Sequence, residues 1–137
     1  SYTRTGLKTG TKYTYKVRAY KNADKEKLYS SYSKAASAKP ALSKAAGVKA
    51  KNSKGKKAAV SWKKVSGASG YEVYRSTKKK AGFKKITTIK KNGTVKYTNK
   101  KLKKGKTYYY KIKAYRTVNG KKVYASFSNT AKVKIKK

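Results

Sequence analysis

The chain repeats itself at a constant offset of 95 residues. Residues 1–40 align with residues 96–135 without a gap, and the apolar positions stay in phase. The matched pairs include Tyr2 and Tyr97, Leu7 and Leu102, Gly10 and Gly105, Tyr13 and Tyr108, Tyr15 and Tyr110, Val17 and Ile112, Tyr29 and Tyr124, and Ser33 and Ser128. Self-similarity at a fixed period indicates repeated structural units. We predict that residues 41–137 form one complete unit and that residues 1–40 are the C-terminal part of another.

The chain's one proline marks the expected boundary between these two parts. Pro40 follows the last strand-like run of residues 1–40 and precedes the first run of the complete unit. Proline cannot donate a hydrogen bond to a β-ladder and therefore interrupts strand pairing. We place the boundary at Lys39-Pro40-Ala41.

Short runs of alternating apolar and polar residues fill the complete unit, with turn residues between them. A period of two predicts β-strands, and regularly spaced short strands predict an all-β sandwich or barrel. Strands are expected near residues 48–50, 58–63, 71–74, 83–89, 95–98, 106–116 and 131–135. Asn92-Gly93 predicts a hairpin-type turn. No segment has convincing helical periodicity.

Three motifs give the complete unit a family resemblance. Val60-Ser61-Trp62, Gly70-Tyr71-Glu72-Val73-Tyr74-Arg75 and Leu102-Lys103-Lys104-Gly105-Lys106-Thr107-Tyr108 together resemble fibronectin type III domains. The resemblance implies a seven-stranded immunoglobulin-like β-sandwich over 41–137, preceded by the E, F and G strands of another copy. It also implies that the Tyr108 hydroxyl bonds to backbone where the chain crosses from the strand at 95–98 to the strand at 106–116.

The amino-acid composition of the repeat has an implication for the origin of the protein. Its abundance of Lys and Tyr is similar to repeat arrays in secreted or wall-attached proteins of Gram-positive bacteria. The resemblance therefore implies a bacterial protein that is secreted or held at the cell surface. No signal-peptide pattern begins at Ser1, and we expect neighbouring domains of a longer parent protein.

Several residue types are missing, and their absence excludes most chemistry. The chain has no His and no Cys, and only 3 Asp and Glu, of which Glu72 alone lies in the complete unit. The usual protein ligands of zinc, copper, haem and iron–sulfur clusters are thus lacking, and the complete unit lacks the carboxylate pair of a glycosidase. We predict no catalytic residue, no cofactor and no metal site. No stretch approaches the roughly 20 apolar residues of a membrane span.

The inward-facing residues of the expected strands are predicted to form the core between the sheets. The alternation places one set of large side chains on a common face. This predicted core contains Trp62, Tyr71, Tyr108, Tyr110 and Ile112, together with Leu102 of the Leu-x-x-Gly-x-x-Tyr motif. Trp62 is interpreted as a packing residue rather than a ligand-stacking one.

The opposite phase of the same strands predicts a cationic, Tyr-rich sheet face. The expected strands at 71–74, 106–116 and 131–135 are neighbours in a sandwich of this type. Their outward residues are Tyr74, Tyr109, Lys111, Lys113, Tyr115, Lys132 and Lys134, with Glu72 as the only acid. Lys and Tyr in this arrangement predict a polyanion- or glycan-binding face. The alternative is a soluble surface that resists aggregation, since Lys protects sheet faces and edges.

Three functions remain open at this point. The first is an extracellular spacer and adhesion module whose net charge of +38 holds anionic polysaccharides or teichoic acid-like polymers. The second is a specific protein- or carbohydrate-binding module that uses its loops or the Tyr-rich face. The third is non-specific nucleic-acid binding, which a strongly basic chain shows whatever its biology.

Residues 1–40 lack the other half of their own sandwich. Their inward set, Tyr13, Tyr15, Val17 and Ala19, has no partner strands within that stretch. A few strands with an exposed apolar face are rarely stable alone. We expect one of three partners to cover that face: a second copy through self-association, the complete unit, or residues outside this chain.

Overall fold

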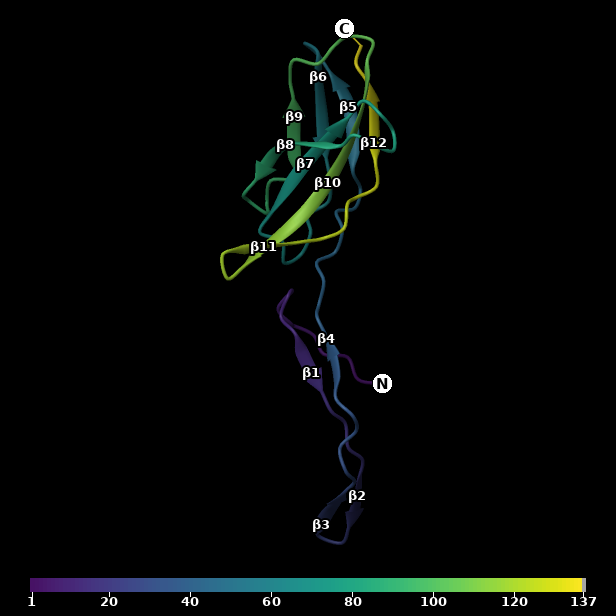
Figure 1. The fold of residues 1–137 in the computed structure, drawn as a ribbon, viewed down its shortest axis with the longest axis vertical. Coiled ribbons are helices and arrows are strands. Elements are labelled where there is room, and N and C mark those ends of the chain that lie inside the picture. Colours follow the sequence, from purple (N-terminus) through teal and green to yellow (C-terminus); the bar gives the residue numbers. More distant parts are fainter. Residues whose placement is uncertain (137) are drawn as a thin grey trace. The chain divides into compact units, whose positions relative to one another are not determined.

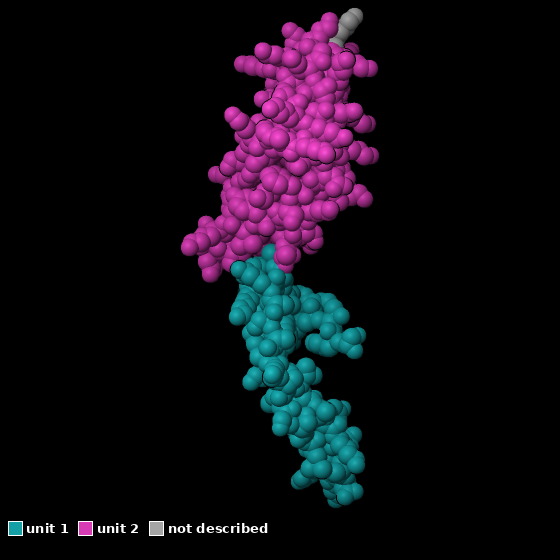
Figure 2. Space-filling model, turned by 45° about the vertical axis from the view of Figure 1, so that its right-hand side comes forward, with its two compact units in different colours: residues 1–40 teal, residues 41–137 magenta. Residues whose placement is uncertain are grey.

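The structure is a computed structural model that describes residues 1–136, which form strands and no helix. The chain divides into two compact units, Ser1–Pro40 and Ala41–Lys137, hereafter unit 1 and unit 2 (Figure 2). Within the described part of the chain, no helix is long and apolar enough to cross a membrane.

Unit 2 is built from two antiparallel sheets in separate layers (Figure 1). The first sheet has the order β5-β6-β9, and the second has β11-β10-β7-β8, with β12 also paired to β10. The strands are β5 (Lys49–Ser53), β6 (Lys57–Ser61), β7 (Gly70–Ser76), β8 (Lys84–Ile89), β9 (Lys96–Asn99), β10 (Thr107–Val118), β11 (Lys121–Tyr124) and β12 (Ala131–Lys134). This arrangement confirms the predicted all-β sandwich.

The core of unit 2 lies between the two sheets. All six residues of the predicted core are buried there, and Tyr110 and Ile112 have no exposed surface. The Trp62 ring meets the Tyr71 ring edge-on, with centroids 5.3 Å apart. Packing of this kind contributes about 0.5–1.5 kcal/mol beyond the area that the rings bury.

Tyr108, near the start of β10, fixes the connection between β9 and β10. The Tyr108 hydroxyl accepts a hydrogen bond of 3.1 Å from the Lys103 backbone N–H. Gly105 sits in the connecting turn with a φ of 78°, a conformation that glycine adopts without strain. The Leu-x-x-Gly-x-x-Tyr motif therefore acts as the tyrosine corner that its resemblance implied.

Two turns differ from the roles that their sequences suggest. Asn92-Gly93 does form a turn, with the Thr94 N–H donating to the Lys91 carbonyl, but it joins strands of different sheets and is not a hairpin. The Asn92 side chain instead accepts a hydrogen bond from the buried Tyr71 hydroxyl at 2.7 Å. Asn119-Gly120 has positive φ at both residues and closes the β10–β11 hairpin, which adds a strand, β11, absent from the prediction.

Unit 1 contains two short strand pairs. The strand β1 (Tyr13–Tyr15) pairs with β4 (Ala36–Ala38), and β2 (Tyr20–Ala23) pairs with β3 (Glu26–Tyr29). Both pairs are antiparallel. Most side chains of these four strands are exposed.

Candidate functional site

The outer side of the five-stranded sheet carries most of the predicted face. The register places Lys111 opposite Tyr74, Lys113 opposite Glu72, and Tyr109 opposite Lys132. Tyr74, Tyr109, Lys111 and Lys113 are half-buried, whereas Lys132 and Lys134 are exposed. These six residues, together with Phe83 and Phe127, are called the lysine–aromatic face below.

Aromatic rings hold the two central lysines of this face. The Lys111 Nζ lies 4.5 Å from the centre of the Phe83 ring and 5.7 Å from that of Phe127. The Lys113 Nζ lies 4.9 Å from the ring centres of both Tyr124 and Phe127. Each such cation–π contact is worth about 0.5–1 kcal/mol at an exposed site. The ammonium groups are therefore kept at defined positions over the sheet.

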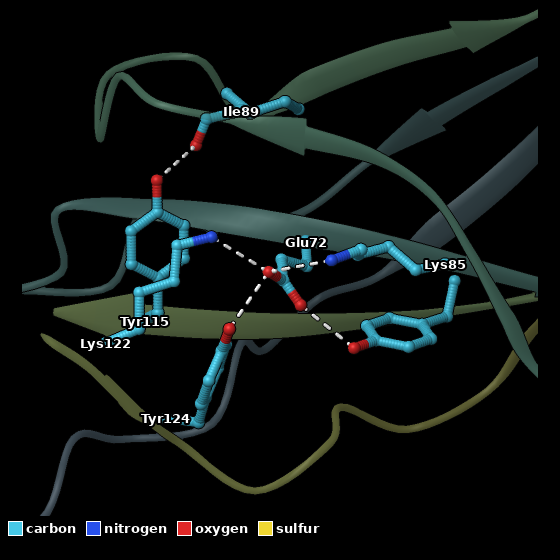
Figure 3. Close-up of polar contacts among 7 residues, drawn as sticks. Glu72, Lys85, Ile89, Tyr115, Lys122 and Tyr124 are labelled. Atoms are coloured by element: carbon cyan, nitrogen blue, oxygen red, sulfur yellow. Dashed lines mark hydrogen bonds and ion pairs between the residues drawn. The ribbon is translucent and has the colours of Figure 1, made fainter.

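Glu72 is buried beneath this face, where the strand phase alone predicted an outward acid. Its side chain is 1% exposed. Its carboxylate accepts hydrogen bonds from the Tyr74 hydroxyl at 2.9 Å, and from Lys122 Nζ and the Tyr124 hydroxyl at 3.0 Å each (Figure 3). Lys85 Nζ adds an ion pair at 3.5 Å. The β11 hairpin covers Glu72 by supplying two of these partners.

The hydrogen-bond partners decide the charge state of this carboxylate. Burial by itself would raise the pKa of Glu72, but the hydrogen bonds from Lys122, Tyr74 and Tyr124 outweigh burial and lower that pKa below 4.5. Burial, followed by the bond to Glu72, raises the pKa of Tyr74 to about 12. The bond to Glu72 also raises the pKa of Lys122. Glu72 is thus ionised and Tyr74 neutral at physiological pH.

Tyr115 was predicted on the exposed face, and this is wrong because its side chain is only 4% exposed. It lies opposite Gly70 in the register, and the missing side chain leaves room for the ring. Its hydroxyl reaches the Ile89 carbonyl at 3.4 Å, and the Lys122 Nζ stands 4.3 Å from its ring centre (Figure 3). Tyr115 is therefore a packing residue.

Sequence reasoning missed four members of this region. Phe83, Lys122, Tyr124 and Phe127 contact the predicted residues but were not assigned to the face. Phe127 lies outside the strands, where alternation does not indicate an orientation. Phe83 stands at the start of the strand expected over 83–89 and directly precedes the observed β8. The available signal for Lys122 and Tyr124 was the Asn119-Gly120 pair, whose two-residue hairpin folds the following residues back over β10.

The arrangement presents positive charge and aromatic surface. Unit 2 has one acidic side chain, and that side chain is buried and paired. The exposed charges of its side chains are therefore all positive. Among residues 1–136, no group of three or more His, Cys, Asp or Glu could hold a metal ion.

Comparison with known proteins identifies the family. The profile of the fibronectin type III domain matches residues 43–129. A Fn3-like protein from Clostridium thermocellum is 31% identical, with a TM-score of 0.58 over 72% of this chain and 95% of that one. A myokine structure is 18% identical, with a TM-score of 0.56 over 69% of this chain and 98% of that one.

A third solved structure covers nearly the whole chain. The FN1–FN3 domains of chicken CNTN1 are 18% identical, with a TM-score of 0.58 over 99% of this chain and 46% of that one. No curated protein matches the chain. The profile match spans more than half of the chain, and its motifs form the sandwich core and the tyrosine corner: the chain belongs to the fibronectin type III domain family.

Proposed function

We propose that this chain is a non-catalytic extracellular spacer and adhesion module that binds anionic polymers through the lysine–aromatic face. Fibronectin type III domains are commonly non-catalytic extracellular modules. The observation that carries the proposal is the burial of Glu72. Because the single acid of unit 2 is enclosed and neutralised by its partners, no side-chain carboxylate on the surface of that unit repels a polyanion.

The form of the face suits a flexible polymer. Lys132 and Lys134 lie on β12 opposite Tyr109 and Thr107 of β10. The aromatic-held Lys111 and Lys113 follow Tyr109 on the same side of β10. Ammonium groups bind phosphate and sulfate as point charges without demanding one planar geometry. The ligands we propose are therefore anionic wall polymers of the teichoic acid type, or sulfated and sialylated host glycans.

Salt titration of heparin binding by the full chain tests the electrostatic mechanism. Exposed charges are screened beyond about 10 Å at roughly 0.1 M salt, and binding releases counterions from the polymer. We expect affinity to fall by at least about tenfold between about 50 and about 500 mM NaCl. Affinity that stays constant over this range would reject the mechanism.

A matched pair of variants tests the location. Lys132→Gln with Lys134→Gln removes two charges from the face, and Lys78→Gln with Lys79→Gln removes two from the loop after β7. Both pairs lower the net charge equally. We expect the first pair to weaken heparin binding more than the second. Equal weakening would assign binding to overall charge and not to this face.

One observation favours carbohydrate recognition as a second candidate. Phe127 and Tyr124 remain 38% and 41% exposed on the same side of the sheet as the two central lysines. Exposed rings of this kind can stack on neutral sugars. Binding of a neutral glycan that is lost in a Tyr124→Ala, Phe127→Ala double variant, yet is insensitive to salt, would favour this candidate over charge.

A further inference from the structure

Unit 1 reproduces the internal bonding of the second half of unit 2. The register of β1 with β4 matches that of β10 with β12, and the β2–β3 register matches β10–β11, each at an offset of 95 residues. The Tyr13 hydroxyl accepts from the Lys8 N–H at 2.9 Å, just as Tyr108 accepts from Lys103. Unit 1 therefore repeats the pairing of β10 with β11 and β12. Residues 1–4, the counterparts of β9, and residues 16–19, the counterparts of the middle of β10, are not in strands.

The two regions differ in what covers their apolar side chains. Val17 is 71% exposed, whereas its counterpart Ile112 has no exposed surface. Tyr20 is 58% exposed, whereas its counterpart Tyr115 is 4% exposed. In unit 1 an open hollow of about 850 Å³ is lined by Tyr2, Leu7, Tyr15 and Val17, among others. Their counterparts in unit 2 all belong to the core or pack against it.

In unit 2, residues 41–95 supply the other side of that core. Ile112 pairs with Val73 across β10 and β7, and Ala114 pairs with Tyr71. Unit 1 contains no counterparts of β5, β6, β7 and β8. The hollow thus corresponds to the half of the sandwich that those four strands fill.

Polar groups indicate the chemistry of the missing occupant. Lys27 and Tyr29 are the counterparts of Lys122 and Tyr124, which hold the Glu72 carboxylate. The Lys27 Nζ already lies 4.5 Å from the Tyr20 ring centre, as Lys122 does at 4.3 Å from Tyr115. Arg18 is the counterpart of Lys113. Its guanidinium carbon lies 3.7 Å from the Tyr29 ring centre, as the Lys113 Nζ lies 4.9 Å from that of Tyr124. This positive cluster is arranged around a place where unit 2 has an acid.

We propose that the exposed face of unit 1 is a docking surface for a polypeptide segment carrying the first four strands of a fibronectin type III module. The third strand of this segment presents apolar residues at the positions of Tyr71 and Val73 and a carboxylate at the position of Glu72. The apolar residues fill the hollow against Val17, and the carboxylate pairs with Lys27 and Tyr29. Strand addition of this kind combines main-chain hydrogen bonds with side-chain pockets.

Amide hydrogen exchange tests the proposal in the full chain and in a chain with a second copy of residues 41–95 joined directly ahead of Ser1. No linker is needed, because residue 1 is the counterpart of residue 96. We expect amides of residues 13–38 to exchange at least about tenfold more slowly in the extended chain. Unchanged exchange there, with the original β5–β12 region still protected, would overturn the proposal.

Two variants of the added copy test the carboxylate. Glu72→Lys in that copy places a positive charge against Lys27 and Arg18, and we expect it to remove most of the gained protection. Lys78→Gln in the same copy changes a loop charge and should leave the protection intact. Equal protection in both variants would refute the role of the carboxylate.

A dilution series separates this occupant from a second copy. The exchange of residues 13–38 in the unextended chain should not depend on protein concentration. Protection that grows with concentration would assign the face to self-association and overturn the proposal.

Discussion

Glu72 is the buried carboxylate on which both the stability of the β11 hairpin and the positive charge of the surface depend. Four side chains from three strands, β7, β8 and β11, converge on a single carboxylate. Removing a buried charge partner costs more than a surface ion pair contributes, since buried polar groups depend on their bonds. The carboxylate therefore ties the β11 hairpin to the centre of the sheet while leaving the surface positive.

We expect Glu72→Gln to lower the free energy of unfolding of unit 2 by about 1–3 kcal/mol at neutral pH, because the amide cannot replace the charged hydrogen bonds. Urea unfolding followed by fluorescence of Trp62, the chain's only Trp, reports on this unit. Glu26→Gln, on the exposed β3, is the matched control and should not shift the transition.

The stability that the Glu72 carboxylate contributes should fall in acid. Because the folded-state pKa of Glu72 lies below 4.5, its contribution is present above about pH 4.5 and is lost as pH falls through the folded value. The wild type should lose this stability in acid, and Glu72→Gln should not. Parallel acid profiles for the two proteins would show that the carboxylate contributes nothing through ionisation.

At the scale of elements, β7 is the strand on which the sheet depends. It pairs with β10 along its whole length and with β8 on its other side, where the register shifts between Val73 and Tyr74. Gly70 begins this strand at a point where Ile89 and Tyr115 approach its backbone. The Ile89 carbonyl oxygen and the Tyr115 ring leave no room for a side chain there.

Gly70→Ala should lower the stability of unit 2 by about 1–3 kcal/mol or more, as overpacking does. The added Cβ would lie 2.7 Å from the Tyr115 hydroxyl and nearer still to the Ile89 carbonyl oxygen. Thermal unfolding measures the change. Gly93→Ala is the control, because its Cβ would meet nothing within 4 Å, and an equal effect of both substitutions would contradict the packing argument.

At the scale of the whole molecule, the two units differ in how completely they bury apolar surface. Unit 2 encloses a core of Trp, Tyr and aliphatic residues between two sheets. Unit 1 leaves Tyr2, Val17, Tyr20, Leu28, Tyr29 and Tyr32 between 50% and 80% exposed. Segments with few buried apolar contacts open at low free-energy cost.

Limited proteolysis with chymotrypsin should therefore cut unit 1 first. The enzyme cleaves after aromatic residues, and Tyr20, Tyr29 and Tyr32 are accessible, whereas Tyr71 and Tyr110 have no exposed surface. We expect a resistant product that begins after Tyr32 and contains unit 2, detected by mass spectrometry. First cuts after Tyr124 or Phe127 would contradict this difference in stability between the units.

Much of the architecture could be predicted from the sequence alone. The alternation of apolar residues located seven strands, and core residues such as Tyr71, Tyr110 and Ile112 followed from strand phase, since successive side chains of a strand point to opposite faces. Leu102 lies outside the strands and was assigned to the core from its motif. The charge imbalance and the lack of His and Cys are properties of composition and need no coordinates.

The tertiary structure decided what covers each face, because strand phase assigns a side but not its exposure. Glu72 and Tyr115 both have the outward phase, yet both are buried, Glu72 under Lys122 and Tyr124 of the β11 hairpin and Tyr115 in the space left by Gly70. Conversely, Val17 has the inward phase of Ile112 but stays exposed, because residues 1–40 lack the strands that would pack on it. Burial depends on neighbours distant in sequence, and a local pattern cannot contain them.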